Sequence, residues 1–161
     1  MRKALFLFLA VSVVFSSCKK TYLFQYVDVN CKGRGQGGTK QISIATRAGS
    51  KKDLLESAKR DALHALIFRG ITLGNGECPS SPIIPNSSEV DAKHKAFFDQ
   101  FFSSPSMYSQ YVLSASLQAP PGAMKLSEGG YRATYVVTVN YDQLVKYLEN
   151  QGVSRSLKNG L

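Results

Sequence analysis

Alternation of apolar and polar residues is the clearest pattern in the second half of the chain, and it predicts strands. It is strongest over residues 131–140, whose expected inward face has five members: Tyr131, Ala133, Tyr135, Val137 and Val139. Such alternation is typical of an antiparallel sheet with one face in water. A second alternating segment covers residues 111–117, with these expected inward residues: Tyr111, Leu113, Ala115 and Leu117. A short strand is expected over residues 124–127.

Two further strands are predicted before residue 50. Residues 21–31 are rich in aromatic and β-branched residues, and residues 41–48 alternate, so a hairpin is expected across the glycine-rich link between them. Gly33, Gly35 and Gly38 match the G-x-G-x-x-G spacing of a dinucleotide-binding loop, but such a loop must open a helix. Because a strand follows instead, we interpret these glycines as a hairpin tip.

Helical spacing predicts three helices, over residues 50–70, 89–102 and 141–151. The first begins with an S-x-x-D capping box at Ser50 and Asp53 and ends at Gly70. Its apolar stripe has these members: Leu54, Leu55, Ala58, Ala62, Ala65 and Leu66. The second helix is expected to begin with a box at Ser88 and Asp91, and the third with Asn140 as its cap.

The chain has two histidines, and we interpret both as structural residues. His64 projects away from the apolar stripe of the first helix, which suggests a surface or second-layer position. His94 lies amid the apolar face of the second helix, one turn before Phe97 and Phe98, and a histidine on such a face is usually part of the core.

The predicted order is β-β-α-α-β-β-β-α, which indicates an α+β fold. An antiparallel sheet with helices packed on one face would bury both the strand faces and the helical stripes. Residues 18–161 show no internal repeat, so a single domain of that extent is expected after a separate leader at residues 1–17.

That leader has the three parts of a signal peptide. Arg2 and Lys3 precede an uncharged apolar run from Ala4 to Phe15, and Ser16-Ser17-Cys18 follows. The ending resembles the lipobox of bacterial lipoproteins, which implies cleavage before Cys18 and a lipid anchor on its thiol. Ordinary secretion and a retained membrane helix are the alternatives, although a helix over residues 4–17 would span only about 21 Å of a roughly 30 Å hydrocarbon layer.

The lipoprotein resemblance implies a location and partners. Lys19 follows the cysteine where inner-membrane retention in enteric bacteria uses Asp, so the resemblance implies an outer-membrane lipoprotein facing the periplasm. Lys19 and Lys20 would lie among anionic headgroups. A secreted or soluble periplasmic protein is the alternative. The helix segment Ser57–Leu63 is also similar to small envelope lipoproteins and flagellar accessory domains, which have assembly roles.

Two cysteines, Cys31 and Cys78, remain once Cys18 is assigned to the anchor. An exported protein with an even pair is expected either to form a disulfide or to bury two free thiols. The formal net charge of +9 is compatible with acidic partners or with a solvated basic surface. The basic residues are scattered and accompany no nucleic-acid-binding motif, so no nucleic-acid partner is expected.

No catalytic motif, metal-ligand spacing or cofactor motif is present, so a non-catalytic protein is predicted. Ile83 and Ile84, between Pro82 and Pro85, either fill the rim of the core or form an exposed partner contact. Tyr108 and Tyr111 are candidates for stacking on glycan rings. The sequence therefore favours a lipid-anchored envelope protein with a structural or assembly role, contacting an envelope protein or the cell wall. The alternative is a periplasmic module that binds a small ligand or glycan.

Overall fold

The computed structural model describes residues 24, 26–85, 87–119 and 122–154. The predicted signal peptide, Cys18 and the two lysines after it lie outside these residues. So do the side chains of residues 87–93, on which the predicted cap of Ser88 and Asp91 falls.

The strands form one sheet in the order β3-β1-β2-β6-β4, and β5 also pairs with β6. Their bounds are β1 Val29–Arg34, β2 Thr39–Ala48, β3 Leu73–Gly74, β4 Val112–Leu117, β5 Met124–Lys125 and β6 Tyr131–Asn140. All neighbours are antiparallel except β1 and β3, which run parallel. The α+β fold is therefore confirmed, but the sheet is mixed, because the long loop after the first helix adds a short parallel strand.

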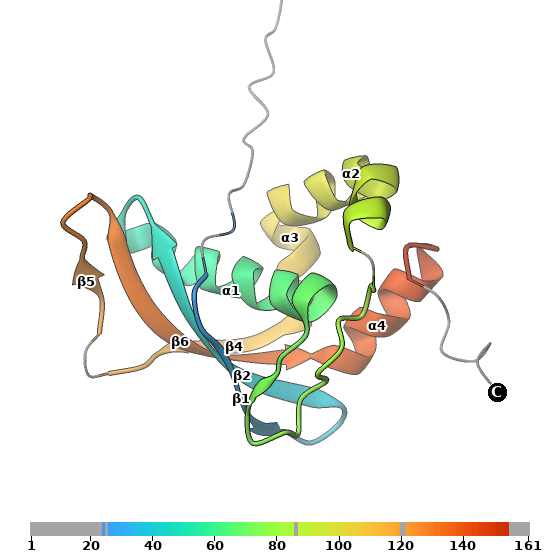
Figure 1. Ribbon diagram of the computed structural model, residues 1–161, viewed down its shortest axis with the longest axis horizontal. Coiled ribbons are helices and arrows are strands. Elements are labelled where there is room, and N and C mark those ends of the chain that lie inside the picture. Colours follow the sequence, from blue (N-terminus) through green and yellow to red (C-terminus); the bar gives the residue numbers. More distant parts are fainter. Residues whose placement is uncertain (1–23, 25, 86, 120–121, 155–161) are drawn as a thin grey trace, which may run out of the picture.

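The helices gather mainly on one side of this sheet. Their bounds are α1 Leu54–His64, α2 Ser87–Ser103, α3 Pro105–Tyr108 and α4 Tyr141–Asn150. Figure 1 shows α1, α2 and α3 on the same side of the sheet, with α4 beyond the end of β6. Single turns extend these elements: a 3₁₀ turn Lys51–Asp53, a π turn Ala65–Arg69 and a 3₁₀ turn Ser109–Tyr111.

The core lies between α1 and the two central strands. Ile42 and Ile44 of β2 are fully buried opposite Val137 and Tyr135 of β6. Ala58 and Ala62 of α1 are also fully buried, because small side chains let this helix lie close to the sheet. The inward face predicted for residues 131–140 is confirmed, with Ala133, Tyr135, Val137 and Val139 buried.

Two helix ends follow the predicted sequence signals. Gly70 ends the first helical segment at φ 74°, and a Cβ there would overlap the backbone carbonyl of Ser80. Asn140 caps α4, its side-chain oxygen accepting the Gln143 N–H at 3.4 Å. At the start of the first helix, the Ser50 hydroxyl instead donates to the Asp53 carboxylate at 2.5 Å, so the predicted box does not reach the backbone.

Three predicted elements differ from the structure. The first strand begins at Val29 rather than near residue 21. Residues 105–108, to which the sequence patterns assigned no element, form α3 with Pro105 at its first position, where a missing N–H costs nothing. The second predicted helix bends at His94, whose φ of −112° and ψ of 20° are not helical.

The predicted inward face of residues 111–117 was partly wrong. Leu113 and Leu117 are 57% and 45% exposed, whereas Val112 and Ala115 pack against the core. The pairing of β4 with β6 shifts between Val112 and Ser114, and such a bulge moves the alternation by one residue. Because β4 also lies at the end of the sheet, its remaining side chains have fewer neighbours.

Candidate functional site

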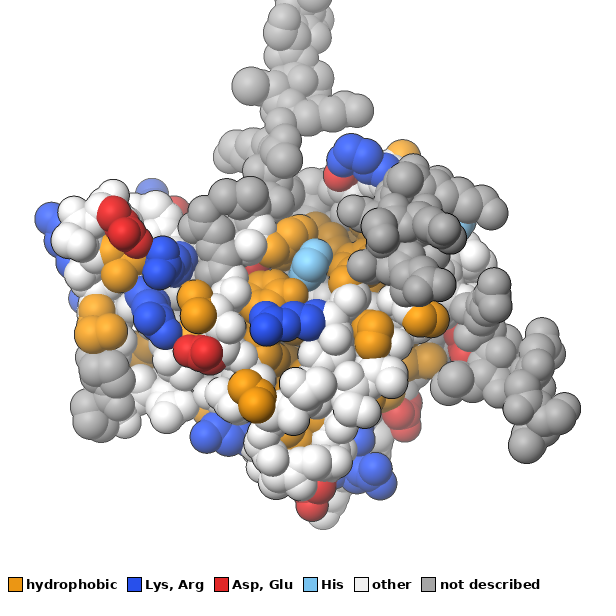
Figure 2. All heavy atoms as spheres, in the orientation of Figure 1, with side chains coloured by type: hydrophobic (Ala, Val, Ile, Leu, Met, Phe, Trp, Pro, Cys, Tyr) orange, Lys and Arg blue, Asp and Glu red, His pale blue; other side chains and the backbone are white. Residues whose placement is uncertain are grey.

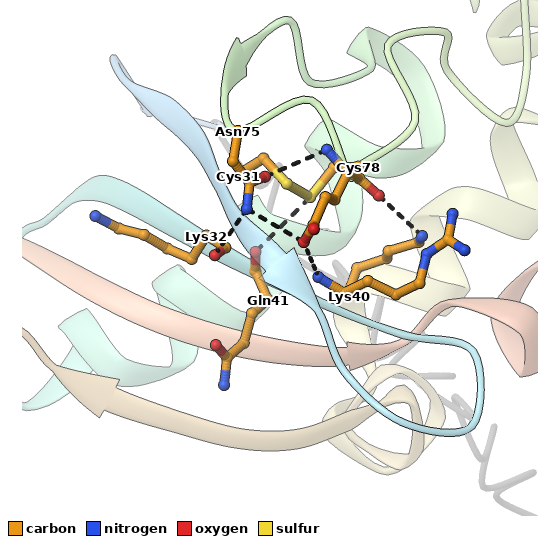
Figure 3. Close-up of a disulfide and its surroundings, with 8 residues drawn as sticks. Cys31, Lys32, Lys40, Gln41, Asn75 and Cys78 are labelled. Carbon is orange, nitrogen blue, oxygen red and sulfur yellow. Dashed lines mark hydrogen bonds between the residues drawn. A yellow bond between two sulfur atoms is a disulfide. The ribbon is translucent and has the colours of Figure 1, made fainter.

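Cys31 and Cys78 form a disulfide between β1 and the loop after α1 (Figure 3). Their Cα atoms are 5.7 Å apart and both side chains are buried. Of the two arrangements that the sequence left open, a disulfide or two free buried thiols, the structure contains the disulfide. The bridge closes a sequence separation of 47 residues. In the chain-entropy model, a loop of that length restricts the unfolded state by about 4 kcal/mol.

Hydrogen bonds hold the cysteine loop against the β1–β2 hairpin. The Lys40 ammonium donates to the carbonyl of Glu77 at 3.1 Å, and the Glu77 carboxylate accepts the backbone N–H of Arg34 at 2.9 Å. The Asn75 amide donates to the carbonyl of Lys32 at 3.2 Å. Figure 3 shows these groups around the two sulfur atoms. The loop is therefore fixed to the hairpin at Asn75 and Glu77, directly before Cys78.

A cleft of about 540 Å³ opens beside this loop. It is bounded by the hairpin, the cysteine loop and the start of α4, and its charged and aromatic lining residues are Arg34, Lys40, Glu77, Tyr141 and Asp142. The Lys40 ammonium lies 5.9 Å from the centre of the Tyr141 ring. Two basic and two acidic side chains thus share one concave surface, which suits a small ligand carrying both signs of charge.

A second cluster surrounds His64 at the end of α1. Its ring stacks on Phe24 with centroids 3.8 Å apart, and Phe68 and Phe102 lie at 4.9 and 5.8 Å. The Tyr26 hydroxyl lies 3.0 Å from Nδ1 of His64. Figure 2 shows a histidine among hydrophobic side chains on the face that carries α1. Of the two positions predicted for His64, surface or second layer, the structure supports the second layer.

Burial lowers the pKa of His64 to about 4. The imidazole is therefore neutral at pH 7 and can accept the Tyr26 hydroxyl proton in a hydrogen bond. His94, by contrast, is only partly buried, at the bend in α2. The expectation that His94 lies within the core is thus met only in part.

Asp61 of α1 is a buried acid that the sequence interpretation missed. Its carboxylate accepts a hydrogen bond from the Thr46 hydroxyl of β2. Burial raises the pKa of Asp61 to about 6, against the lowering effects of this hydrogen bond and of the Arg60 charge. A helical wheel could have found it, because Asp61 is three residues after Ala58 and falls inside the apolar stripe.

The glycan-stacking prediction for Tyr108 and Tyr111 was wrong. Their side chains are only 2% and 6% exposed. The Tyr108 hydroxyl donates to the Glu56 carboxylate at 2.9 Å, and the Tyr111 ring lies 5.3 Å from that of Tyr147. Burial raises the pKa of Tyr111 to about 12. Both rings join α3 and its following turn to the core, so neither face is open to a sugar.

The segment from Pro82 to Pro85 also faces the core rather than a partner. Ile84 is 2% exposed, and its N–H donates to the carbonyl of Ile67 at 2.9 Å. Ile83 is partly buried and donates to the carbonyl of Leu66 at 3.1 Å. The segment thus covers the end of the first helix. Of the two predicted roles, filling the rim of the core is the one that the structure supports.

The outer edge of β4 is an exposed strand edge with apolar side chains. β4 ends the sheet, and no described strand pairs with its outer side. Leu113 and Leu117 are exposed on it, and Met124 of β5 is 44% exposed nearby on the same side of β6. The sequence has no charged residue or histidine from Gln100 to Met124. This surface could have been suspected from that uncharged run.

Two other features are absent from the described residues. No group of three or more His, Cys, Asp or Glu side chains is placed to hold a metal ion there. Nor does that part of the chain contain a helix with the length and apolar character needed to cross a membrane.

Comparisons with known proteins found no relatives. No protein-family model matches the chain, and neither a curated protein nor a solved structure is detectably similar to it. Functional arguments about this protein therefore rest on its own residues.

Proposed function

We propose that this chain is a lipid-anchored, non-catalytic protein of the cell envelope that acts in assembly by contacting other proteins. The anchor is Cys18, and the lipobox-like ending Ser16-Ser17-Cys18 is the basis for it. The periplasmic face of the outer membrane is the proposed location, because Lys19 follows the cysteine.

The disulfide supports the exported location. Disulfides form and persist in oxidising compartments and are rare in the cytosol. Cys31 and Cys78 are buried and bonded, and the loop between them is held by side-chain hydrogen bonds as well. A chain whose core includes such a bridge is suited to the periplasm or to the cell exterior.

The uncharged outer edge of β4 carries the proposed interaction role. A sheet edge has a row of backbone groups that another strand can pair with, and proteins usually protect such edges with lysine, proline or short strands. β4 has six residues, VLSASL, with neither lysine nor proline, and it exposes Leu113 and Leu117. These properties favour strand pairing with a protein partner.

Site-specific photocrosslinking in the native envelope tests this role. A photoreactive residue is placed at Leu113 in one variant and at Leu117 in another, and protein adducts are expected. The same residue at Leu73 is the matched control, because Leu73 lies at the opposite edge of the sheet and is 56% exposed. Absence of adducts from both Leu113 and Leu117, or equal adducts from Leu73, would contradict the proposed surface.

The anchor has its own test. Cys18→Ala should move the protein from the membrane fraction to the soluble fraction, since two or more acyl chains hold a protein stably on a bilayer. The paired variant Cys31→Ala/Cys78→Ala should stay with the membrane and serves as the control. Unchanged partition of the Cys18 variant would rule the lipid anchor out.

The cleft beside the disulfide favours a second candidate function, the binding of a small ligand. Its volume of about 540 Å³ is within the range of ligand sites, and Lys40 and Tyr141 lie together on its wall. Titration calorimetry with chitotriose and with an acidic dipeptide tests it. Heat that disappears in Tyr141→Ala would support the site, and no heat with either probe would speak against it.

A further inference from the structure

We propose that the partner of the β4 edge is β4 of a second copy of this chain, so that two sheets join across a two-fold axis. This inference rests on the proposed interaction role and gives it a specific partner. Its basis is a palindrome: residues 113–117 read Leu-Ser-Ala-Ser-Leu in both directions. A two-fold axis beside Ala115 therefore places like residues opposite one another.

The antiparallel pairing that follows is self-complementary. Ala115 lies opposite the second copy's Ala115, each Ser114 lies opposite a Ser116, and each Leu113 lies opposite a Leu117. Serine pairs can exchange hydrogen bonds across strands, and leucine pairs exclude water at both ends. A slip of one residue would oppose serine to alanine or leucine, so the palindrome also specifies the register.

The backbone at the centre of β4 has the orientation that this pairing needs. The Gln118 N–H donates to the carbonyl of Thr134 at 2.8 Å, so the peptide groups of Gln118 point toward β6. In an antiparallel ladder this direction alternates along the strand. The N–H and carbonyl of Ala115 therefore point outward. Two copies can therefore exchange two backbone hydrogen bonds across the axis, each from the N–H of one Ala115 to the carbonyl of the other.

The bulge in β4 does not interrupt this centre. The pairing shift lies between Val112 and Ser114, whereas Ser114, Ala115 and Ser116 pair regularly with Thr138, Val137 and Val136 of β6. Ser114 and Ser116 are exposed, and Ala115 is only partly buried. The three central residues thus form a regular, accessible stretch of edge.

The charge of the chain favours this edge over the rest of the surface. Cleavage before Cys18 removes Arg2 and Lys3 and lowers the formal net charge from +9 to about +7, and two copies with this charge repel one another at most orientations. The uncharged run from Gln100 to Met124 includes β4 and the turn before it, so contact there brings no like charges together along the strand. At the opposite edge, β3 has only two residues and is flanked by Asn75 and Glu77.

The test is the association state of the full chain, purified in a non-ionic detergent and measured by analytical ultracentrifugation. A concentration-dependent dimer is expected. The double variant Leu113→Lys/Leu117→Lys should weaken association by roughly tenfold or more, because lysines would face one another across the axis. Leu73→Lys is the matched control and should leave the dimer intact.

A second variant keeps the test independent of misfolding. Ala115→Pro removes an N–H that points away from β6, and proline is tolerated at such edge positions. This variant should keep the far-UV circular dichroism of the parent and still be monomeric. A parent that is monomeric at every concentration would overturn the proposal, as would a dimer that persists in both the lysine and proline variants.

Disulfide trapping tests the register. Ala115→Cys should give a covalent dimer on mild oxidation, since directly opposite, hydrogen-bonded residues have Cα atoms about 5.5 Å apart, within disulfide range. Ser127→Cys, in an exposed turn outside β4, is the control, and the parent chain shows any link through Cys18. If no Ala115→Cys dimer forms while Leu117 still crosslinks to a different protein, the proposed function survives and the self-pairing is wrong.

Discussion

The Thr46 hydroxyl of β2 donates a hydrogen bond to the Asp61 carboxylate of α1, and both side chains are buried. One turn further along α1, Nδ1 of His64 lies 3.0 Å from the Tyr26 hydroxyl, and the ring is partly buried among aromatic rings. A buried acid and a partly buried base therefore lie three residues apart on one helix. Because burial disfavours the charged form of each, their effects on stability have opposite dependence on pH.

Asp61→Asn should reveal the contribution of His64. Burial lowers the pKa of this histidine from 6.5 to about 4, so between these values the unfolded chain binds a proton that the folded chain does not. The free energy of unfolding should then rise by about 3 kcal/mol as the pH rises from 4 to 6.5. Urea unfolding across this pH range measures it, and a flat profile would contradict the assigned environment of His64.

His64→Phe should reveal the opposite slope. Burial raises the pKa of Asp61 from 3.8 to about 6, so the folded chain keeps a proton that the unfolded chain releases. The contribution of Asp61 to the free energy of unfolding is therefore present below pH 4 and is lost as the pH rises to about 6. The change is about 3 kcal/mol. The double variant Asp61→Asn/His64→Phe removes both groups, and its profile is the reference for all other titrating groups.

In the unaltered protein the two slopes should largely cancel between pH 4 and pH 6. This cancellation requires both pKa shifts at once, so it tests the environments of Asp61 and His64 together. A steep change in the unaltered chain, relative to the double variant, would show that one of the two side chains is solvated in solution.

Sequence patterns predicted the elements whose faces are regular. Residues 131–140 alternate without interruption between two neighbouring strands, and the structure follows them from Tyr131 to Asn140. Gly70 and Asn140 could be assigned as helix ends because each acts through local backbone geometry. The sequence did not decide whether the disulfide forms, because the distance between Cys31 and Cys78 depends on how the whole loop folds back onto β1.

The candidate surfaces were harder to predict, because exposure depends on neighbours distant in sequence. Tyr108 became buried through a bond to Glu56 in α1, fifty-two residues earlier in the chain. Leu113 became exposed through a bulge and an edge position, neither of which the alternating pattern reveals. The palindrome around Ala115 favours self-pairing only because β4 lies at the end of the sheet, and the sequence does not give that position.

Gly70→Ala should destabilise the protein more than Gly76→Ala. The two glycines share a positive φ, of 74° and 76°, and Gly70 combines it with a ψ of 174°, a region that is essentially restricted to glycine. A Cβ at Gly76 would meet open space, so only the left-handed conformation is penalised there, by about 1–2 kcal/mol. At Gly70 the Cβ would also overlap the Ser80 carbonyl, and the loop leading to Ile83 and Ile84 would have to move.

Urea unfolding of both alanine variants measures this difference. Gly76→Ala serves as the control for a positive φ, and the extra loss in Gly70→Ala reports the ψ of 174° and the contact with Ser80 together. Equal losses would contradict both the constrained backbone at Gly70 and the tight cover that the Ser80 segment forms over the end of the first helix.

Replacing Cys31 and Cys78 together by alanine should lower the free energy of unfolding by up to about 4 kcal/mol. The cysteine loop would lose its covalent link to β1 and keep its hydrogen bonds from Lys40 and Asn75. The free energy of unfolding should therefore be similar for the reduced parent and the double variant, and higher for the oxidised parent. Labelling of the denatured, non-reduced parent with a thiol reagent provides the check on the bond itself: a label on either Cys31 or Cys78 would show that the bridge is not formed in the protein as isolated.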